Sequence, residues 1–318
     1  MLSSSVNKIG DHKEIIFTYK SELGNFNIGI LCSYGATLNR IEIPFQNKKF
    51  NLIQGYNNID DFKKAYRGVL LAPFPNRIKN GQYVFENNTY QLPINKPTEN
   101  NTLHGLLYNQ SFKIVEKKVT EDQAKLILSN DYKGELEGYP FRFSTEITYV
   151  WQAPNKLKVF TEITNCGKNN MPLGLGWHPY FQFPQGINKI DLKMNTTKKF
   201  LVDEQMIPTL ETTKYSSYKK IKKIEAENFD DCFEVNNSAN VHQTTLIDAL
   251  NGISLTVEQP TTAYKYLQVY TPPTRDCIAI EPMTCPPNAF NNQLGLIKLQ
   301  PNEKYICSYT IHLKFAKV

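Results

Sequence analysis

The strongest constraint on the fold is a two-residue alternation of bulky apolar and polar side chains. It runs through residues 141–151 (FRFSTEITYVW), 156–163 (KLKVFTEI) and 305–315 (YICSYTIHLKF). A period of two buries one face of an extended strand, whereas a helix needs apolar residues every three or four positions. β-Branched and aromatic residues, which favour strands, fill these stretches. Shorter runs of the same kind, at 25–32, 112–119, 124–128 and 264–270, extend the prediction of half-buried strands along the chain.

Turn signals separate these runs, and helical signals are few. Asn251-Gly252, between two apolar runs, is predicted to form a two-residue type I′ hairpin turn. Residues 59–66 could form a short helix. No linker or fixed-period repeat divides the chain. We therefore predict one all-β domain over residues 1–318, a large antiparallel β-sandwich with few short helices.

The composition is typical of a soluble globular protein. The chain has 318 residues, of which 41% are hydrophobic and 21% charged. The net charge of +6 is spread along the chain, so the basic run at 218–223 indicates a solvated surface better than a nucleic-acid patch. No stretch approaches the roughly 18 apolar residues of a membrane span, and the N-terminus lacks signal-peptide features. We expect a cytoplasmic protein that binds neither nucleic acid nor membrane.

Several familiar motifs are absent from the sequence. The six cysteines are scattered without a CxxC pair, which favours free thiols over disulfides or zinc. Gly174-x-Gly176 lacks the third glycine and the βαβ context of a dinucleotide-binding motif. No phosphate-binding loop, HExxH or GxSxG pattern occurs. Nucleotide, zinc and serine-hydrolase chemistry therefore have little support, and no metal or cofactor is expected.

Candidate functional residues lie in polar islands within apolar or turn-rich stretches. The first island ends in Asn76-Arg77, after the apolar run that begins at Leu71. The rigid donor fork of arginine suits a polar ligand, although an ordinary salt bridge at a strand end explains it equally well. The second island, residues 100–106 (NNTLHGL), contains His104. A single histidine in such a setting is more often structural than catalytic.

The third island is residues 174–181 (GLGWHPYF), with His178 between Trp177 and Pro179. His178 could be a packed core histidine or a proton donor. A tryptophan beside a polar group also suits a sugar, because its ring covers C–H surface while polar neighbours bind hydroxyls. Pro179 is predicted to end strand pairing beside the imidazole.

The fourth island places Glu281 at the end of the apolar run 276–280. A buried, unpaired carboxylate is costly, so this residue needs a partner or a chemical role. Pro282 is predicted to stop strand pairing there and leave Glu281 facing a loop or cleft. Asp230, in the stretch 229–233 (FDDCF), is a weaker candidate. Histidines, carboxylates and an arginine on a β scaffold form a general acid/base set.

In this order the islands resemble the motifs of the aldose 1-epimerase (galactose mutarotase) family. The matching pieces run from about Gly35 to Asn291. They are Gly35-Ala36-Thr37-Leu38 with Ile43-Pro44, Asn76-Arg77-Ile78 with Gly81, Leu103-His104-Gly105, Gly176 to Phe181, Asp230-x-x-Phe233 and Ile280-Glu281-Pro282. The resemblance implies a β-supersandwich that interconverts the α and β anomers of a free aldose, as a monomer or homodimer.

The resemblance also implies a role for each residue. Mutarotation removes a proton from the anomeric hydroxyl and gives one to the ring oxygen, so one base and one acid suffice. By resemblance, Glu281 is the base and His178 is the acid. The residues predicted to contact the sugar are Arg77, His104, Asp230, Asn76 and Trp177, with Trp177 expected either to stack on the sugar or to act as a packing wall.

The sequence leaves three competing functions open. A hexose-6-phosphate 1-epimerase would use the same chemistry with added basic residues, which Arg67, Arg275 and Lys265 could supply. A carbohydrate-binding protein without activity would not need the histidines and Glu281 together. A glycosidase with Asp230 and Glu281 as its carboxylate pair leaves both histidines without a role.

Overall fold

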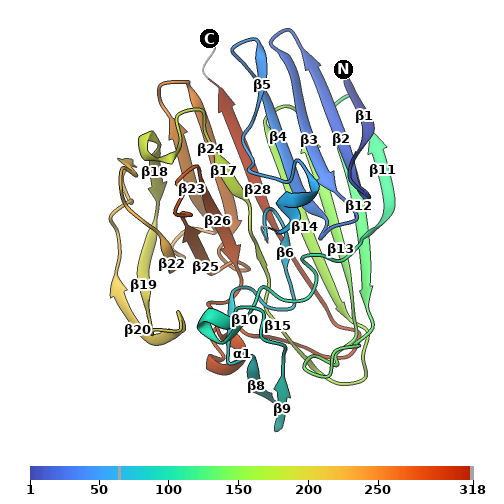
Figure 1. Ribbon diagram of the computed structural model, residues 1–318, viewed down its shortest axis with the longest axis vertical. Coiled ribbons are helices and arrows are strands. Elements are labelled where there is room, and N and C mark those ends of the chain that lie inside the picture. The colour runs from blue at the N-terminus through green and yellow to red at the C-terminus, as the bar shows by residue number, and fades with distance from the viewer. Residues whose placement is uncertain (64–65, 316–318) are drawn as a thin grey trace.

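A computed structural model of the chain describes residues 1–63 and 66–315, which form an antiparallel all-β fold (Figure 1). The N-terminal sheet consists, in order, of β1 (Leu2–Ile9), β2 (His12–Ser21), β3 (Gly24–Leu31), β4 (Thr37–Phe45) and β5 (Lys48–Asn51). The long sheet has the order β11 (Lys113–Val119), β12 (Gln123–Tyr132), β13 (Phe143–Gln152), β14 (Lys156–Asn165), β28 (Lys304–Phe315), β24 (Ile253–Pro260), β23 (Val241–Asp248), β18 (Asp191–Met194) and β21 (Lys222–Lys223).

A third sheet, here called the β26 sheet, positions most of the candidate residues. Its order is β20 (Pro208–Lys214), β19 (Thr196–Val202), β22 (Asp230–Val235), β25 (Tyr266–Tyr270), β26 (Cys277–Met283), β16 (Gly176–Trp177) and β6 (Leu70–Leu71). β17 (Tyr180–Gln182) also pairs with β26. This sheet therefore joins segments that are spread between residues 70 and 283.

Short elements complete the fold. The paired short strands are β7 (Arg77–Lys79) with β10 (Asn101–Leu103), β8 (Gln82–Phe85) with β9 (Asn88–Gln91), and β15 (Met171–Leu173) with β27 (Ile297–Leu299). The helices are the 3-10 turns η1 (Ile59–Lys63), η2 (Pro97–Glu99) and η3 (Ile187–Lys189), and α1 (Ala289–Asn292). The predicted helix at 59–66 is observed as η1, and residues 64 and 65 lie outside the described residues. Among the described residues, no helix has the length and apolar character needed to cross a membrane.

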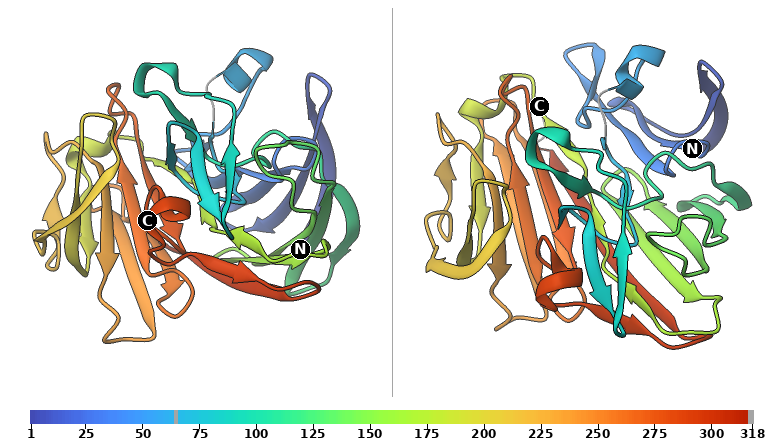
Figure 2. Two further views of the ribbon diagram at one scale, coloured as in Figure 1. Left: turned by 90° about the horizontal axis from the view of Figure 1, so that it is seen from below. Right: turned by 60° about the horizontal axis from the view of Figure 1, so that its bottom comes forward.

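The alternation in the sequence becomes alternating burial in the long sheet. The predicted strands at 141–151, 156–163 and 305–315 are confirmed as β13, β14 and β28, and β13 and β14 bury every second residue. The long sheet packs against both other sheets in one continuous core. On the β26 sheet, Trp177 contacts Tyr149 and Tyr309 of the long sheet. The layers separate clearly when the molecule is seen from below (Figure 2).

The hairpin between β23 and β24 forms where predicted but with a longer loop. Asp248 pairs with Ile253, so four residues connect the strands instead of two. Asn251 does not take the positive φ that a type I′ turn requires, whereas Gly252 does (φ +64°). The Asp248 carboxylate accepts from the Asn251 amide at 3.1 Å and from its side chain at 2.7 Å, which stabilises the wider turn. All six cysteines carry free thiols, as predicted.

Candidate active site

Strand β26 carries Glu281 on the face turned away from the main core. Every residue of this strand is buried, because both of its faces are covered. Ile278 and Ile280 belong to the main core on one face. Alternation turns Glu281 and Met283 to the other face, and Met283 belongs to a separate small cluster there. Glu281 is only 1% exposed.

His178 lies opposite Glu281 because β16 and β17 pair with β26 in the same register, although the pairing is interrupted between them. β16 pairs with β26 through Gly176 and Met283, and β17 resumes that register beyond the break. Directly opposed residues share a face of the sheet, so the two side chains meet. His178 Nε2 is 3.4 Å from Glu281 Oε1.

Two prolines lie at this break. Pairing with β26 is interrupted after Gly176 and resumes at Tyr180 in β17, so the predicted break beside His178 is present. The break begins before Pro179, whose carbonyl still accepts from Ile280 N. Pro282 does not end β26, so that prediction is wrong. The amides of Ile280 and Thr284, on either side of Pro282, donate to the opposing chain at 3.3 and 2.8 Å. The missing N–H of Pro282 falls between these bonds, where the ladder is already broken, so proline is tolerated within the strand.

A reciprocal pair of hydrogen bonds joins Asn76 to His104. At the ends of the paired strands β7 and β10, His104 N donates to Asn76 O at 2.9 Å, and Asn76 N donates to His104 Nδ1 at 3.3 Å. The neutral His104 ring therefore carries its proton on Nε2. Its centroid is 5.2 Å from that of His178. Gly105 (φ +72°) allows this segment to lie against the backbone of Ala72, because a Cβ there would lie 2.1 Å from Ala72 O.

Arg77 is fixed by two carboxylates and an amide. Its Nε and Nη2 donate to Glu99 at 2.7 and 3.3 Å, and its Nη1 donates to Asn76 Oδ1 at 3.1 Å. Arg77 Nη2 also lies 3.9 Å from Asp230 Oδ2. Gln268 Nε2 donates to the other oxygen of Asp230 at 2.9 Å. The guanidinium is therefore oriented before any ligand arrives.

Three neighbouring side chains across the β26 sheet keep buried polar atoms without a partner. Gln268 of β25 pairs opposite Glu281, which in turn lies opposite His178. Gln268 Oε1, Glu281 Oε2 and His178 Nδ1 are buried, and none has a hydrogen-bond partner among the described residues. Buried polar atoms are normally paired. A row of unpaired ones is typical of a site that receives a polar ligand.

Burial shifts the pKa values of the histidines and the carboxylates of the site in opposite directions. Burial lowers the pKa of His178 to about 3. Burial, with the charge of Asp230 adding to it and Arg77 opposing it, raises the pKa of Glu281 well above its usual range. Burial and the neighbouring charges of His178 and Arg77 lower the pKa of His104. Burial also raises the pKa of Asp230, against the charge of Arg77.

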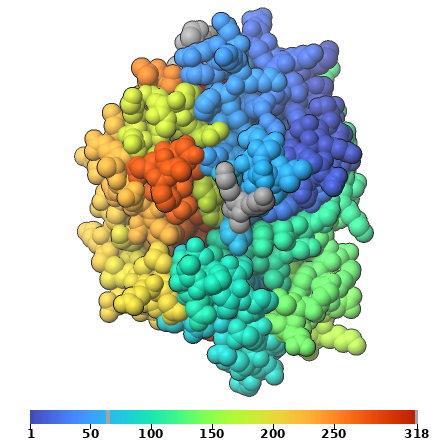
Figure 3. Space-filling view, viewed as in Figure 1, coloured from blue at the N-terminus to red at the C-terminus, as the bar shows by residue number. Residues whose placement is uncertain are grey.

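Solvent exposure decreases along the site, from Asp230 to His178 and Glu281. The Asp230 side chain is 37% exposed, whereas His178 is 4% exposed and Glu281 1%. Four segments meet on one face of the molecule in Figure 3. They are coloured yellow, teal, blue and orange, and they include residues near 205, 100, 60 and 275, respectively. A ligand held by Asp230 and Arg77 at its outer end would reach Glu281 and His178 at its inner end.

Trp177 does not belong to this group, which corrects its predicted role as a sugar contact. It is fully buried, and its Nε1 donates to Thr161 Oγ1 of the long sheet at 3.1 Å. Adjacent residues in a strand face opposite sides, so His178 and Trp177 cannot both face the site. Trp177 is part of the core between two sheets.

Three residues of the site were not singled out from the sequence. Tyr180 stacks on His178 with centroids 4.7 Å apart and an interplanar angle of 10°. Strand alternation could have indicated this contact, since the two residues are two positions apart. Glu99 and Gln268 gave no such signal, because their partners lie far away in the sequence. Within residues 1–63 and 66–315, no three His, Cys, Asp or Glu side chains are grouped as metal ligands would be.

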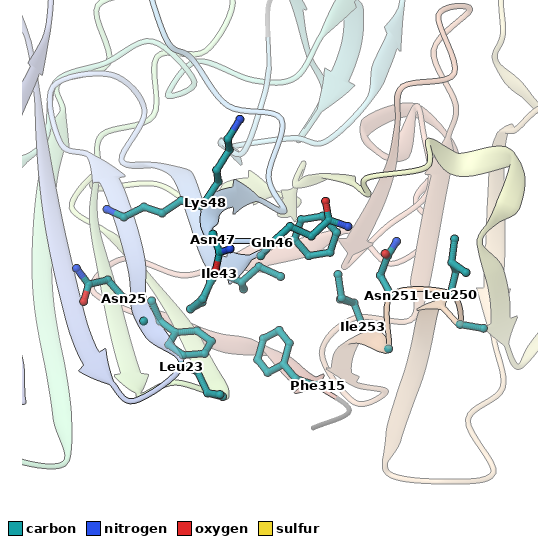
Figure 4. A pocket seen from close by; sticks show the side chains of 17 residues that line it. Leu23, Asn25, Ile43, Gln46, Asn47, Lys48, Leu250, Asn251, Ile253 and Phe315 are labelled. Carbon is teal, nitrogen blue, oxygen red and sulfur yellow. The ribbon is translucent and has the colours of Figure 1, made fainter. Parts of the chain in front are cut away.

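A separate cavity of about 930 Å³ lies between the N-terminal sheet and the β23–β24 hairpin (Figure 4). Ile43, Ile253 and Phe315 contribute apolar surface to it, and Lys48 and Asn25 contribute polar groups. None of the candidate site residues lines it, and its described lining contains no histidine or carboxylate. The cavity therefore offers no acid/base pair.

Comparison with known sequences identifies one family. A family model described as aldose 1-epimerase matches residues 29–312. The chain is 30% identical over 268 residues to the uncharacterized protein YihR of Escherichia coli (strain K12), covering 80% of this chain and 81% of that protein. It is 27% identical over 197 residues to the galactose mutarotase of Rattus norvegicus, covering 58% of this chain and 53% of the rat protein.

Solved structures share the fold over almost the whole chain. A galactose mutarotase-like protein from Clostridium acetobutylicum superposes with a TM-score of 0.86 at 22% identity, covering 99% of both chains. A galactose 1-epimerase from Lactobacillus acidophilus gives a TM-score of 0.79 at 19% identity, covering 100% of this chain and 99% of that chain. These likenesses confirm the predicted galactose mutarotase-like β-sandwich.

Replacing Trp177 tests its placement in the core. We expect Trp177→Phe to lower the free energy of unfolding by about 1–3 kcal/mol, because it removes packed volume and the bond to Thr161. The measurement is chemical denaturation followed by circular dichroism. Thr161→Val should add little to Trp177→Phe in the double variant, since the shared bond is already lost. Unchanged stability of Trp177→Phe would contradict the core placement.

Replacing Glu99 tests the charge balance around Arg77. The charge of Glu99 raises the pKa of Asp230, and that of Arg77 lowers it. Glu99→Gln removes the first influence and keeps the second, so the pKa of Asp230 should fall. Carbon-13 NMR titration of the aspartate carboxyls measures this shift, with the exposed Glu121→Gln as the matched control. An unchanged Asp230 titration in Glu99→Gln would show that the two carboxylates do not share Arg77.

Proposed function

The chain belongs to the aldose 1-epimerase family, and we propose that it interconverts the α and β anomers of an aldose whose anomeric hydroxyl is free. The observation that carries this proposal is the His178–Glu281 pair, 3.4 Å apart, with an unpartnered polar atom on each residue. An acid and a base side by side at the closed end of a polar site are what ring opening requires. We further propose that residues 1–318 act as one domain in the cytoplasm.

The reaction needs two proton transfers at neighbouring oxygens. Glu281 takes the proton of the anomeric hydroxyl, and His178 gives a proton to the ring oxygen. The bond between the anomeric carbon and the ring oxygen breaks, and the open-chain aldehyde rotates about its C1–C2 bond. Reclosure on the other face of the carbonyl returns both protons. His178 and Glu281 then exchange the roles of acid and base.

The electrostatics of the pair suit this exchange of roles. Burial disfavours the charged form of both groups, which lowers the pKa of His178 to about 3 and raises that of Glu281. The pair therefore keeps one proton over a wide pH range. Neutral histidine with protonated glutamate has the same net charge as imidazolium with carboxylate. Either state can thus be reached by moving one proton, without changing the net charge of the buried site.

The outer residues fit the task of holding the ring. Arg77 presents the donors left over from Glu99 and Asn76, and Asp230 presents carboxylate oxygens. Sugar hydroxyls both donate and accept, so a donor fork beside an acceptor matches two adjacent hydroxyls. His104, with its proton on Nε2, would donate toward the ring oxygen beside His178. These contacts fix the anomeric centre against the pair.

Simple sugar binding and glycoside hydrolysis both account for less of the site. A binding protein without activity would gain nothing from an unpaired carboxyl and imidazole in a nearly closed position, where each lowers stability. A glycosidase built on Asp230 and Glu281 leaves His178 without a task, although its imidazole lies 3.4 Å from Glu281.

Glu281→Gln tests the proposed base. We expect kcat/KM for anomerisation, after subtraction of the spontaneous rate, to fall by about 100- to 10,000-fold, which is the usual contribution of a general base. Exchange between the α and β anomeric protons in NMR measures the rate at equilibrium. Glu258→Gln is the matched control, because Glu258 pairs with His312 at 2.7 Å outside the site. Equal rates for wild type and Glu281→Gln would contradict the proposed mechanism.

The pH profile tests the shared proton. The pair gains a second proton only near the His178 pKa of about 3 and loses its last proton only above the usual pKa of a glutamate. Activity should therefore show no acid limb with a midpoint near 6.5, the ordinary pKa of histidine. The folded pKa of His178 is depressed, so the stability due to its neutral form is present above 6.5 and declines toward pH 3. The folded fraction must therefore be measured at each pH, and an acid limb centred near 6.5 in folded protein would contradict the account.

A further inference from the structure

One arginine beside the candidate site has a nearly unused guanidinium. Arg40 pairs with Glu14 and Glu42, and Arg77 pairs with Glu99. Within the described residues, Arg67, which is half-buried, donates a single side-chain hydrogen bond, from Nη1 to the backbone oxygen of Gly55 at 3.1 Å. No carboxylate in the described part of the chain lies within ion-pair distance of it. A half-buried cation without a counter-ion is unfavourable, and an incoming anion would relieve this.

The sequence also suggested Arg275 and Lys265 as residues that could bind an anion, but neither is suited to this role at the site. Arg275 already uses four of its five donors, on the side chains of Asn188 and Asn228 and on the backbone oxygens of Glu225 and Glu227. Lys265 is exposed. It lies just before β25, an odd number of positions from Gln268, so alternation turns it away from the face that carries Glu281. Arg67 is therefore the basic residue to consider.

Arg67 lies next to the acid/base pair along the backbone. The following residue, Gly68, donates its amide to the carbonyl of His178 at 2.9 Å. Gly55, which accepts from the Arg67 side chain, follows Gln54, whose amide donates to Tyr180 O at 2.9 Å. Burial raises the pKa of the Tyr180 hydroxyl, and the charge of Arg67 opposes it, as expected for a nearby cation. The guanidinium thus lies by Tyr180, on the side of His178 away from Asp230.

We propose that Arg67 binds an anionic group on the exocyclic carbon of the sugar, so that the preferred substrate is an aldose carrying a phosphate or carboxylate there. This inference rests on the proposed function. In a pyranose, the exocyclic carbon is attached to the ring carbon next to the ring oxygen. With that oxygen at His178, a substituent directed along the strand toward Tyr180 has about 7 Å to span, the length of two residues.

The charges at the two ends of the site set the direction in which such a sugar binds. Glu99 pairs with Arg77 and lies 3.8 Å from Lys96. Asp230 lies 3.9 Å from the same Arg77, so the cations at the outer end already have carboxylate partners and attract a further anion less. The Arg67 end holds an unpaired cation. Asp276 lies in that region, but its oxygens accept from Gln54 and Thr274 rather than from Arg67. An anionic sugar is therefore directed with its charge toward Arg67 and its hydroxyls toward Arg77.

The test compares substrates and variants in one anomerisation assay. The substrates are glucose, glucose 6-phosphate and glucuronate, and the variants are Arg67→Met, Arg67→Lys and Lys265→Met. We expect wild type to show a lower KM for at least one of the two anionic sugars than for glucose. Arg67→Met should raise that KM by about 10- to 100-fold, which is the loss expected for a charge-assisted hydrogen bond, and leave KM for glucose nearly unchanged. The KM of Arg67→Lys for that sugar should lie between those of wild type and Arg67→Met. The KM of Lys265→Met should resemble that of wild type.

The outcomes separate this inference from the proposed function. Selectivity for the phosphate alone or for the carboxylate alone supports the inference and identifies the anion. If glucose is turned over and Arg67→Met affects all three sugars equally, the anion site is wrong and the proposed function stands. If wild type accelerates none of the three and equals Glu281→Gln, both are wrong. Thermal melting of each variant identifies loss of folding, and Arg67→Lys keeps the test decisive if Arg67→Met does not fold.

Discussion

The candidate site depends on one constraint, the register of the chain that pairs with β26. β16 and β17 keep the same register on both sides of a break, and this places the His178 imidazole against the Glu281 carboxyl at 3.4 Å. A shift of one residue would turn either side chain into the core. The break itself falls where Pro179 and Pro282 remove ladder donors, so the sheet loses little there. The acid/base pair is therefore a consequence of sheet pairing rather than of loop conformation.

Burial then determines what the pair can do. Both groups are almost without solvent, which lowers the pKa of His178 and raises that of Glu281. The unfavourable free energy of their unpaired atoms is offset by a large core that continues through all three main sheets. The surrounding charges are divided unevenly, with Glu99 and Asp230 on Arg77 at one end and Arg67 at the other. This division is what gives a bound sugar a preferred direction.

Much of the fold follows from the sequence, but the site follows from it only in part. Alternation with a period of two predicted β13, β14 and β28 because those strands bury one face each. His178 and Glu281 were identified as polar residues in apolar surroundings. Trp177 was left between stacking on the sugar and packing, although strand alternation already excludes two adjacent residues from one face. Glu99 gave no local signal, since its role depends on contact with Arg77 across 22 positions.

The most direct test of the central claim is a crystal structure of the protein with a bound aldose. The account predicts that the anomeric oxygen lies within hydrogen-bond distance of Glu281 and the ring oxygen within that distance of His178, with ring hydroxyls at Arg77 and Asp230. A sugar bound elsewhere, such as in the cavity beside Phe315, with the His178–Glu281 pair empty, would contradict the account.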